Sequence, residues 1–354
     1  MARIITIADK ASGVALGLIA LANLLFVLSF IILLLVGSSH ARADQAAACT
    51  GQNLLAELER SDPAKFELIR HEADRTLNGK GLLWRIEKDG LEPSFLFGTM
   101  HLTDDRVTDL TDEARTAFEQ ANTVVIETTD ILDEGKAAMA LLAHPELMML
   151  PGSDSLRTLL SAEDLAVVTE ALDGRGIPLG SVIKMQPWLL TATISIPACE
   201  FARRKGGLSV LDAKLAHDAE ALGKEIAGLE TGVSQLQAMA SLPMDLHLQG
   251  LVQTLKLGDR INDMFETLIV LYLDGEIGMV WPLFKSILPT DDPAGYGEFE
   301  RVMITTRNHG MVENAEPFLQ AGGAFIAVGA LHLPGEEGIV ELLRNTGYRV
   351  TQAD

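Results

Sequence analysis

Apolar residues follow two periods along the chain, one typical of strands and one typical of helices. Short apolar runs at 82–87 and 94–98 flank the turn sequence Lys88-Asp89-Gly90 and predict a β-hairpin. Similar short runs predict further strands, at 123–127, 225–230, 324–329 and 348–350. All but one of the predicted strands therefore lie toward one or the other end of the chain.

Most of the remaining chain has apolar residues at helical spacing, and Pro- or Gly-rich breaks divide the longer segments. The predicted helical segments are 52–77, 111–120, 131–204, 212–222, 235–288, 296–319 and 338–345. Residues 94–127 form a strand, a helix and a second strand in that order. Such a crossover unit places two parallel strands side by side, with their C-terminal ends at one edge.

One short motif occurs twice, each time at the end of an apolar run. Residues 94–102 are SFLFGTMHL and residues 324–333 are AFIAVGALHL, so Gly98 precedes His101 as Gly329 precedes His332. Glycine lets the backbone leave a strand at an angle that other residues resist, so each histidine is expected just beyond a strand end. In α/β proteins ligands usually bind at that edge. The repeated motif therefore predicts two imidazoles in one cleft.

These patterns together predict an α/β fold. Its central mixed sheet is expected to come from N- and C-terminal strand–Gly-x-x-His–helix units that resemble each other. Long helical insertions are expected at about 131–222 and 235–320.

Two predicted strands end on a carboxylate, one at Glu127 and the other at Glu230. Because parallel strands share an edge, His101 and Glu127 are expected to be neighbours. Two imidazoles with two carboxylates suit a divalent metal such as zinc, manganese or cobalt, which lowers the pKa of a bound water and polarises a carbonyl. A histidine beside a carboxylate is equally a general base without any metal.

Arg307, in the helical segment 296–319, is the fifth candidate. A guanidinium can hold a substrate carboxylate or stabilise an oxyanion. Each candidate has an ordinary alternative: Glu127 and Glu230 could cap helices or form salt bridges, and Arg307 could lie on a solvated face. His309 is a weak candidate because it lies close to Arg307. The other histidines are in polar helical stretches and are expected at the surface: His71, His144, His217 and His247.

Composition limits the partners. With 49 acidic and 28 basic residues the formal net charge is -21, and no basic stripe or aromatic stacking pattern occurs, so a nucleic-acid partner is not expected. The sequence also lacks a Gly-x-Ser-x-Gly elbow, a His-Glu-x-x-His motif, a P-loop and a dinucleotide-binding glycine motif. These absences argue against the usual serine hydrolases, thermolysin-like proteases, nucleotide hydrolases and NAD enzymes.

The N-terminal region predicts export. Residues 13–37 are apolar and uncharged, and a helix of this length can span a bilayer at about 1.5 Å per residue. Ala41-x-Ala43 then has the small-x-small form of a signal peptidase site. We predict that residues 1–43 are a signal peptide or an N-terminal membrane anchor, and that residues 44–354 are a single periplasmic or membrane-anchored domain facing the extracytoplasmic side. Membrane attachment is expected only through the N-terminal segment.

The chain has two cysteines, Cys49 and Cys199. In an exported protein a pair is expected to be oxidised, which would tie the start of the mature chain to its middle. The alternative is two unpaired thiols. A cysteine-based metal site is not supported, because neither has a Cys or His neighbour at ligand spacing.

Several stretches resemble the TraB/GumN family, which includes the Tiki proteases, and they occur in the family's order from about residue 82 to 350. They are LWRI at 83–86, FLFGTMH at 95–101, VVIE at 124–127, QPW at 186–188, GLET at 228–231 with Gln235, Arg307-Asn308, and VGALH at 328–332 through Gly347-Tyr348. Each stretch is short, but the set and its order together are specific.

The resemblance implies a sheet core shared with Tiki proteases, erythromycin esterases and haem-binding ChaN proteins. It implies that His101 and His332 belong to the paired Gly-x-x-His signature, and that Glu127, Glu230 and Arg307 match further family positions. For Tiki members it implies metal-dependent proteolysis with manganese or cobalt. The erythromycin esterase branch is thought to use its histidine without a metal.

The first predicted function is an exported metal-dependent hydrolase that cleaves a peptide or protein. His101 and His332 would be ligands, or ligand and base, Glu127 and Glu230 would share metal binding and proton transfer, and Arg307 would orient substrate or stabilise charge. The alternatives on the same fold are a non-catalytic protein that binds a peptide or haem, and a metal-independent esterase-like hydrolase. A ring of four side chains favours the metal, an apolar groove with splayed histidines favours binding, and one histidine paired to a carboxylate suits the metal-free hydrolase.

Overall fold

The computed structural model describes residues 49–287 and 293–354, and residues 49–354 fold as one compact unit. The predicted N-terminal signal peptide or anchor, residues 1–43, lies outside the described residues. Among the helices that are described, none is both long and apolar enough to cross a membrane.

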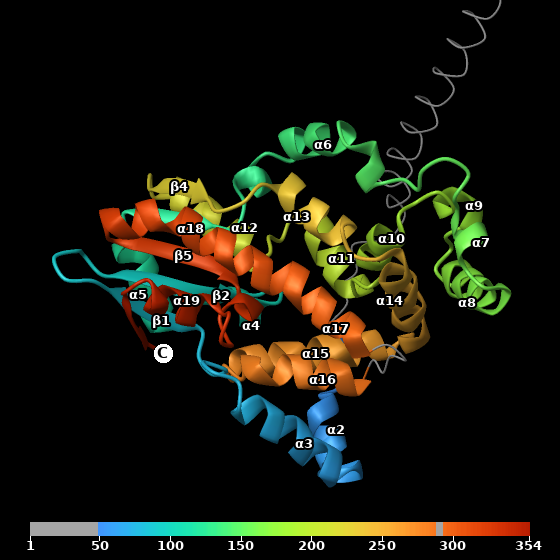
Figure 1. Cartoon of the computed structure of the whole chain (residues 1–354), viewed down its shortest axis with the longest axis horizontal. Coiled ribbons are helices and arrows are strands. Elements are labelled where there is room, and N and C mark those ends of the chain that lie inside the picture. The colour runs from blue at the N-terminus through green and yellow to red at the C-terminus, as the bar shows by residue number, and fades with distance from the viewer. Residues whose placement is uncertain (1–48, 288–292) are drawn as a thin grey trace, which may run out of the picture. The chain divides into compact units, whose positions relative to one another are not determined.

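Six described strands form one mixed sheet in the order β4-β3-β5-β2-β1-β6 (Figure 1). The strands are β1 (Leu83–Glu87), β2 (Ser94–Thr99), β3 (Thr123–Ile126), β4 (Glu225–Gly228), β5 (Ala324–Gly329) and β6 (Arg349–Gln352). β4, β3, β5 and β2 run parallel to one another, whereas β1 is antiparallel to both β2 and β6. The predicted α/β class with a mixed central sheet is confirmed.

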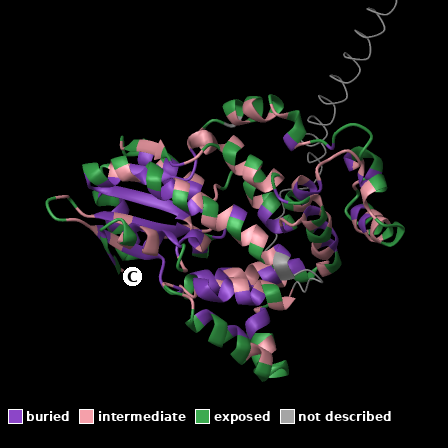
Figure 2. Cartoon of the chain, viewed as in Figure 1, coloured by how far each residue is buried: buried purple, intermediate pink, exposed green. Residues whose placement is uncertain are grey.

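Side chains alternate between the two faces of the sheet, as the strand period requires. Leu83, Phe97, Val124 and Phe325 belong to one buried cluster, which helices α5 and α12 complete. The intervening positions, among them Val125 and Ile326, belong to a second cluster that α18 and α19 cover. The sheet is therefore a middle layer that is buried on both faces, as the purple strands in Figure 2 show.

Helices account for most of the remaining described chain. Those up to β4 are α2 (Leu54–Ser61), α3 (Pro63–Asp74), α4 (Asp105–Thr108), α5 (Asp112–Gln120), η1 (Thr129–Leu132), α6 (Glu134–Leu142), η2 (Pro145–Leu147), α7 (Leu156–Leu159), α8 (Ala162–Asp173), α9 (Leu179–Val182), α10 (Pro187–Ile194), α11 (Ala198–Lys205) and α12 (Leu211–Ala221). Those after β4 are α13 (Gly232–Ala240), α14 (Met244–Leu257), α15 (Arg260–Leu273), η3 (Ile277–Met279), α16 (Val280–Ile287), α17 (Pro293–Glu300), η4 (Arg301–Thr305), α18 (Thr306–Ala321), η5 (Ala330–His332) and α19 (Ile339–Asn345).

The predicted helix over 52–77 is two helices. Asp62 ends α2, and its side chain accepts a hydrogen bond from the Lys65 backbone N–H, so it also caps α3. Pro63 stands at the first position of α3, where its missing N–H costs nothing. The cap and the proline together begin a new helix inside a continuous apolar pattern.

The prediction that the two motif glycines provide a backbone angle that other residues resist is wrong. Neither Gly98 nor Gly329 has a positive φ, so neither is needed for an unusual backbone angle. A Cβ on Gly98 would instead lie 3.0 Å from the Cβ of Ala330 and 3.1 Å from Cδ2 of Leu333. Gly98 therefore allows η5 and the residue after it to pack directly on β2.

The predicted disulfide is confirmed. Cys49 and Cys199 are bonded, with their Cα atoms 5.3 Å apart and a sequence separation of 150. The bond joins the start of the described chain to α11, and such bonds persist in oxidising compartments.

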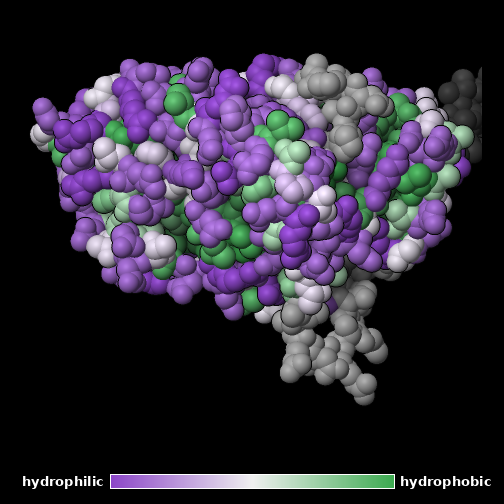
Figure 3. Space-filling view, turned by 90° about the horizontal axis from the view of Figure 1, so that it is seen from below, coloured by the Kyte–Doolittle hydropathy of each residue, from purple (hydrophilic) through white to green (hydrophobic). Residues whose placement is uncertain are grey.

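Hydrophilic residues cover most of the face in Figure 3, and the hydrophobic residues visible there lie in limited patches. This distribution agrees with the strongly acidic net charge of -21. In the described part of the chain, the buried apolar residues gather in the two clusters on the sheet and in three further clusters among the helices.

Phe325 should make one of the larger single contributions to stability. Its side chain is fully buried in the middle strand β5 and contacts the rings of Phe97 and Phe118 at centroid distances of 5.6 and 5.5 Å. Phe325→Ala should lower the free energy of unfolding by about 3–5 kcal/mol in a denaturant titration. The matched change Phe201→Ala, at a ring that is 56% exposed, should alter it by less than about 0.5 kcal/mol. Equal effects at the two positions would contradict this account of the core.

Candidate active site

The ends of three adjacent parallel strands bring His101, Glu127 and His332 together. β2 pairs with β5 so that Thr99 lies opposite Gly329, and β3 pairs with β5 so that Ile126 lies opposite Ala327. A Cβ on Gly329 would lie 3.2 Å from Oε1 of Glu127, 3.5 Å from Cδ2 of His332 and 3.9 Å from Nε2 of His101. The three side chains therefore border one small space beside Gly329, which a larger residue would fill.

The His101 ring is held from α12. Its Nδ1 lies 2.7 Å from Oδ2 of Asp212, and Oδ1 of Asp212 accepts a hydrogen bond of 2.6 Å from the Thr99 hydroxyl. The negative charge of Asp212 raises the pKa of His101 to about 9. The imidazole side chain is 60% exposed whereas Asp212 is 8% exposed, so water screens this ion pair on one side. Because Nδ1 is engaged, Nε2 is the nitrogen that His101 presents to the site.

The His332 ring is held from α18 in a similar way. Its Nδ1 lies 2.6 Å from Oδ1 of Asn308, whose amide nitrogen donates to the backbone carbonyl of Glu337 at 2.7 Å. That second bond leaves Oδ1 as the acceptor, so Nδ1 of His332 carries the proton, and Nε2 lies 3.9 Å from Oε1 of Glu127. Burial lowers the pKa of His332 to about 4, and the ring is therefore neutral at pH 7.

Glu127 is a buried carboxylate with several donors. Oε1 accepts a hydrogen bond of 2.7 Å from the Gly329 N–H, and Oε2 accepts from Nη2 of Arg307 at 2.7 Å and from Nε2 of Gln235 at 2.9 Å. Burial raises the pKa of Glu127, but the nearby His332, His101 and Arg307 side chains and the Gly329 N–H outweigh burial and lower the pKa to about 2. Glu127 is therefore ionised at neutral pH.

Arg307 joins the two predicted carboxylates. Its Nη2 donates to Oε2 of Glu230 at 2.7 Å as well as to Glu127, and its Nε donates to both oxygens of Glu230. Gln235 also donates to Glu230, at 3.3 Å. Arg307 is in the first turn of α18, one residue after Thr306, which follows the π-helical turn η4. Such π-helical turns are frequent at functional sites.

The structure thus forms two linked groups from the five predicted residues. His101, His332 and Glu127 border the space beside Gly329, while Glu230 and Arg307 lie on the other side of Glu127. His309 is outside both groups, since it is exposed and its Nε2 pairs with Glu337 at 2.6 Å. His247, expected at the surface, is buried instead, because its ring lies under α13 with Nε2 3.0 Å from the Met239 carbonyl.

Four supporting residues were missed from the predicted site: Asp212, Asn308, Thr99 and Gln235. Thr99, Gln235 and Asn308 stand within the stretches that carry the family resemblance. Asp212 carries no such signal, because it is in the first turn of a helix, where an acidic residue is ordinary. Its burial beside His101 comes only from the packing of α12 against the sheet.

Comparison with known proteins identifies the family. The model described as the TraB/PrgY/gumN family matches residues 82–352. The chain belongs to this family. Metalloprotease TIKI2 of Danio rerio is 26% identical over 317 residues, covering 76% of this chain and 60% of that protein. Metalloprotease TIKI1 of Homo sapiens is 26% identical over 319 residues, covering 77% of this chain and 61% of that protein.

Metalloprotease TIKI1 of Xenopus tropicalis is similar to the same degree, 26% identical over 340 residues, covering 81% of this chain and 65% of that protein. The chain spans about three-fifths of the length of these curated relatives. No solved structure matches the chain.

The relatives' names imply a metal, and the donor chemistry here can be tested against one. Within the described ranges, no group of three or more His, Cys, Asp or Glu side chains is arranged to hold a metal ion. Nevertheless, His101 and His332 each have Nδ1 bonded to an acceptor and Nε2 available, which is the pattern of metal-binding histidines. With Glu127 they provide a two-nitrogen, one-carboxylate donor set. The residues present therefore fit a divalent cation chemically.

Stability should depend on pH through Glu127. A carboxylate whose pKa is lowered by folding stabilises the fold above its unfolded pKa near 4.5 and loses that contribution as the pH falls toward about 2. The quantity to measure is how much more stable the parent is than Glu127→Gln, as a difference in free energy of unfolding. This difference should become smaller by up to about 3 kcal/mol when the pH is lowered from 5 to 2. Urea titrations with a chelator present measure this difference. A difference that stays constant over that range would contradict the assignment.

Proposed function

We propose that the protein is an exported, metal-dependent hydrolase that cleaves a peptide or protein. The observation that carries the proposal is that both imidazoles border the space beside Glu127, with Nε2 of His332 3.9 Å from Oε1 of Glu127 and each ring fixed through its Nδ1. The relatives named as metalloproteases support the same chemistry. The disulfide supports export, because such bonds form in oxidising compartments.

The charges around the space also favour a cation. Three carboxylates, those of Glu127, Glu230 and Asp212, form ion pairs here with two basic groups, Arg307 and the raised-pKa His101. His332 is neutral. One negative charge is therefore left over in a largely buried cluster, and a divalent cation would offset it.

We assign Nε2 of His101, Nε2 of His332 and a carboxylate oxygen of Glu127 as the proposed ligands. Glu230 was included in the ligand set predicted from sequence, but both of its oxygens accept hydrogen bonds from Arg307, whereas Oε1 of Glu127 lies 3.9 Å from Nε2 of His332. We therefore propose that Glu230 holds Arg307, which in turn fixes the Glu127 carboxylate. A bound manganese, cobalt or zinc ion would supply a water of lowered pKa and polarise the scissile carbonyl.

The residues of the chain have separate tasks in this proposal. His332 is neutral at pH 7 and is ready to bind through Nε2, whereas His101 must first release a proton. Asp212 accepts the hydrogen bond from Nδ1 of His101 and so orients the ring with Nε2 toward the proposed cation. Arg307 keeps Glu127 ionised and stationary.

An apolar groove supports a peptide with apolar side chains as the substrate. It has a volume of about 480 Å³, and Leu331, the residue before His332, is in its wall. The other walls come from α10, α14, α16 and α17, and include Trp281 and Phe299 with ring centroids 6.0 Å apart. An apolar pocket of this size can bury several side chains of an extended substrate. The same groove suits the alternative of a non-catalytic peptide-binding protein.

A metal-independent hydrolase is the second candidate, and the His101–Asp212 pair favours it. The environments of the two histidines push their pKa values apart, to about 9 and about 4, so that at neutral pH one is an acid and the other a base. Such a separation is typical of acid–base pairs in enzymes. A chelator distinguishes the candidates, because it would abolish only the metal-dependent activity.

The direct test uses residues 44–354, prepared with and without Mn²⁺, and measures metal binding by calorimetry and cleavage of a mixed peptide library by mass spectrometry. Loss of a residue that only supports a ligand weakens metal binding by about 10- to 100-fold. His101→Ala and His332→Ala each remove a ligand, so Mn²⁺ affinity should fall by more than this, and cleavage should fall in parallel. His309→Ala, at an exposed ring outside the site, is the matched control and should behave like the parent. Cleavage that survives the chelator would instead favour the metal-free candidate, and no cleavage with intact folding would favour the binding protein.

Gly329→Ala tests the space between the three side chains. The new Cβ would lie 3.2 Å from Oε1 of Glu127, which is closer than most such contacts, and would intrude beside both imidazoles. We expect at least about 10-fold weaker Mn²⁺ binding, the size of an outer-shell effect, with a melting temperature near that of the parent. Gly310→Ala in α18, where a Cβ meets nothing within 4 Å, should leave binding unchanged. Unchanged binding in Gly329→Ala would place the metal elsewhere.

A further inference from the structure

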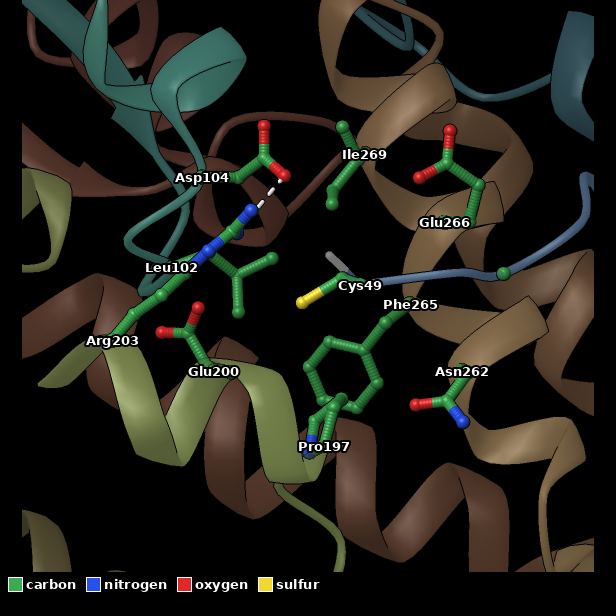
Figure 4. Close-up of a pocket in the computed structure, with 11 residues that line it drawn as sticks. Cys49, Leu102, Asp104, Pro197, Glu200, Arg203, Asn262, Phe265, Glu266 and Ile269 are labelled. Carbon is green, nitrogen blue, oxygen red and sulfur yellow. Dashed lines mark hydrogen bonds and ion pairs between the residues drawn. The ribbon is translucent and has the colours of Figure 1, made fainter. Parts of the chain in front are cut away.

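Residues 101–104, which follow β2 and carry His101, are held by α11 as well as by α12. Four residues on one side of α11 are involved: Cys199, Glu200, Arg203 and Arg204. Cys199 forms the disulfide, and the other three contact the 101–104 segment through their side chains. Figure 4 shows Glu200 and Arg203 of α11 facing Leu102 and Asp104, with Cys49 beside them.

Glu200 makes the most extensive of these contacts. Its carboxylate accepts hydrogen bonds from the Thr103 N–H at 3.0 and 3.2 Å and from the Thr103 hydroxyl at 2.7 Å. Nε of Arg204 donates to the same carboxylate at 2.9 Å. The Glu200 side chain is only 3% exposed, and donors of the His101 loop and of its own helix keep its carboxylate in one orientation.

The arginines of α11 complete the attachment. Nη2 of Arg204 donates to the backbone carbonyl of His101 at 2.7 Å. Nη1 of Arg203 donates to Asp104 at 3.2 Å, and Asp104 also accepts from Arg106. The loop backbone is therefore bonded to α11 at His101 and Thr103, and the Asp104 side chain adds a third attachment. The His101 ring is bonded instead to Asp212 of α12.

The disulfide fixes α11 at the point where these contacts begin. Cys199 directly precedes Glu200 and is bonded to Cys49, 150 residues away in sequence. The cavity between Cys49, Leu102 and Glu200 measures about 20 Å³, which is room for one water at most (Figure 4). No ligand fits there, so the bond and its surroundings serve to hold the loop.

We propose that Glu200 and Arg204 are positioning residues for His101, and that the Cys49–Cys199 disulfide makes this positioning depend on oxidation. The inference rests on the proposed role of His101 in the active site. Asp212 sets the rotation of the ring, and α11 sets the place of the backbone from which the ring extends. Reduction of the disulfide frees the N-terminal end of α11 and loosens the His101 side of the site, while His332, held from α18, keeps its position.

The experiment compares Glu200→Ala, Arg204→Ala and the dithiothreitol-reduced parent with the oxidised parent, all free of metal. Hydrogen exchange at the Thr103 amide should accelerate about 10-fold or more when its acceptor is removed in Glu200→Ala. The ring resonances of His101 in NMR spectra should shift in all three samples, whereas those of His332 in the same spectra should not. Mn²⁺ affinity should then be lower in these three samples than in the oxidised parent. The melting temperature of Arg204→Ala should stay close to that of the parent, because Arg204 is partly exposed.

Conservative variants separate positioning from general stability. Glu200→Gln keeps an oxygen for the Thr103 N–H, and Arg204→Lys keeps one donor for the His101 carbonyl, so both should restore most of the parent His101 signal. Phe201→Ala, on an exposed face of α11, is the matched control and should change neither ring. The NMR and exchange readouts need no catalysis, so they decide the inference even if the protein is not a hydrolase.

Two results would overturn the inference. The first is an unchanged His101 resonance in Arg204→Ala and after reduction. The second is a shift of equal size in the His101 and His332 rings, which would mean general loosening of the fold rather than loss of one attachment.

Discussion

The buried carboxylate of Glu127 is the group on which the rest of the site depends. A charge at this depth is tolerated only with compensating partners, and here these are the Gly329 N–H, Arg307 and Gln235. Each partner comes from a different element, so ionising Glu127 requires β3, β5, α13 and α18 to be in place together. Oε1 of the same carboxylate lies 3.9 Å from Nε2 of His332, which links the folding requirement to the proposed cation.

The sheet explains how these partners meet. β3, β5 and β2 are adjacent and parallel, so the residues that follow them reach one edge although His332 is more than 200 residues from His101 and Glu127 in sequence. Helices on the two faces then hold the two imidazoles separately: α12 orients His101 through Asp212, and α18 orients His332 through Asn308. Gly98 and Gly329 contribute by being small, the first at the contact of η5 with β2 and the second beside Glu127.

Much of the fold could be predicted because strand and helix periods are visible in the sequence. The hairpin, the strand ending before Glu127 and the mixed sheet followed from apolar runs and turn residues, and the disulfide followed from an isolated pair of cysteines. The partner of the His101 ring could not be predicted, because Asp212 is an ordinary acidic residue in the first turn of a helix until α12 packs against the sheet. Burial of His247 and the attachment of Glu230 to Arg307 likewise depend on tertiary packing that no local pattern records.

The central claim is that His101, His332 and Glu127 form one cation site whose rings are oriented through Nδ1. The most direct test is X-ray diffraction from a crystal grown with Mn²⁺, recorded at a wavelength where manganese scatters with a strong anomalous signal. The account predicts one anomalous peak within bonding distance of Nε2 of both histidines and of the Glu127 carboxylate, with Nδ1 of the rings still bonded to Asp212 and Asn308. A well-diffracting crystal with no peak at that place, or with its peak at other ligands, would contradict the account.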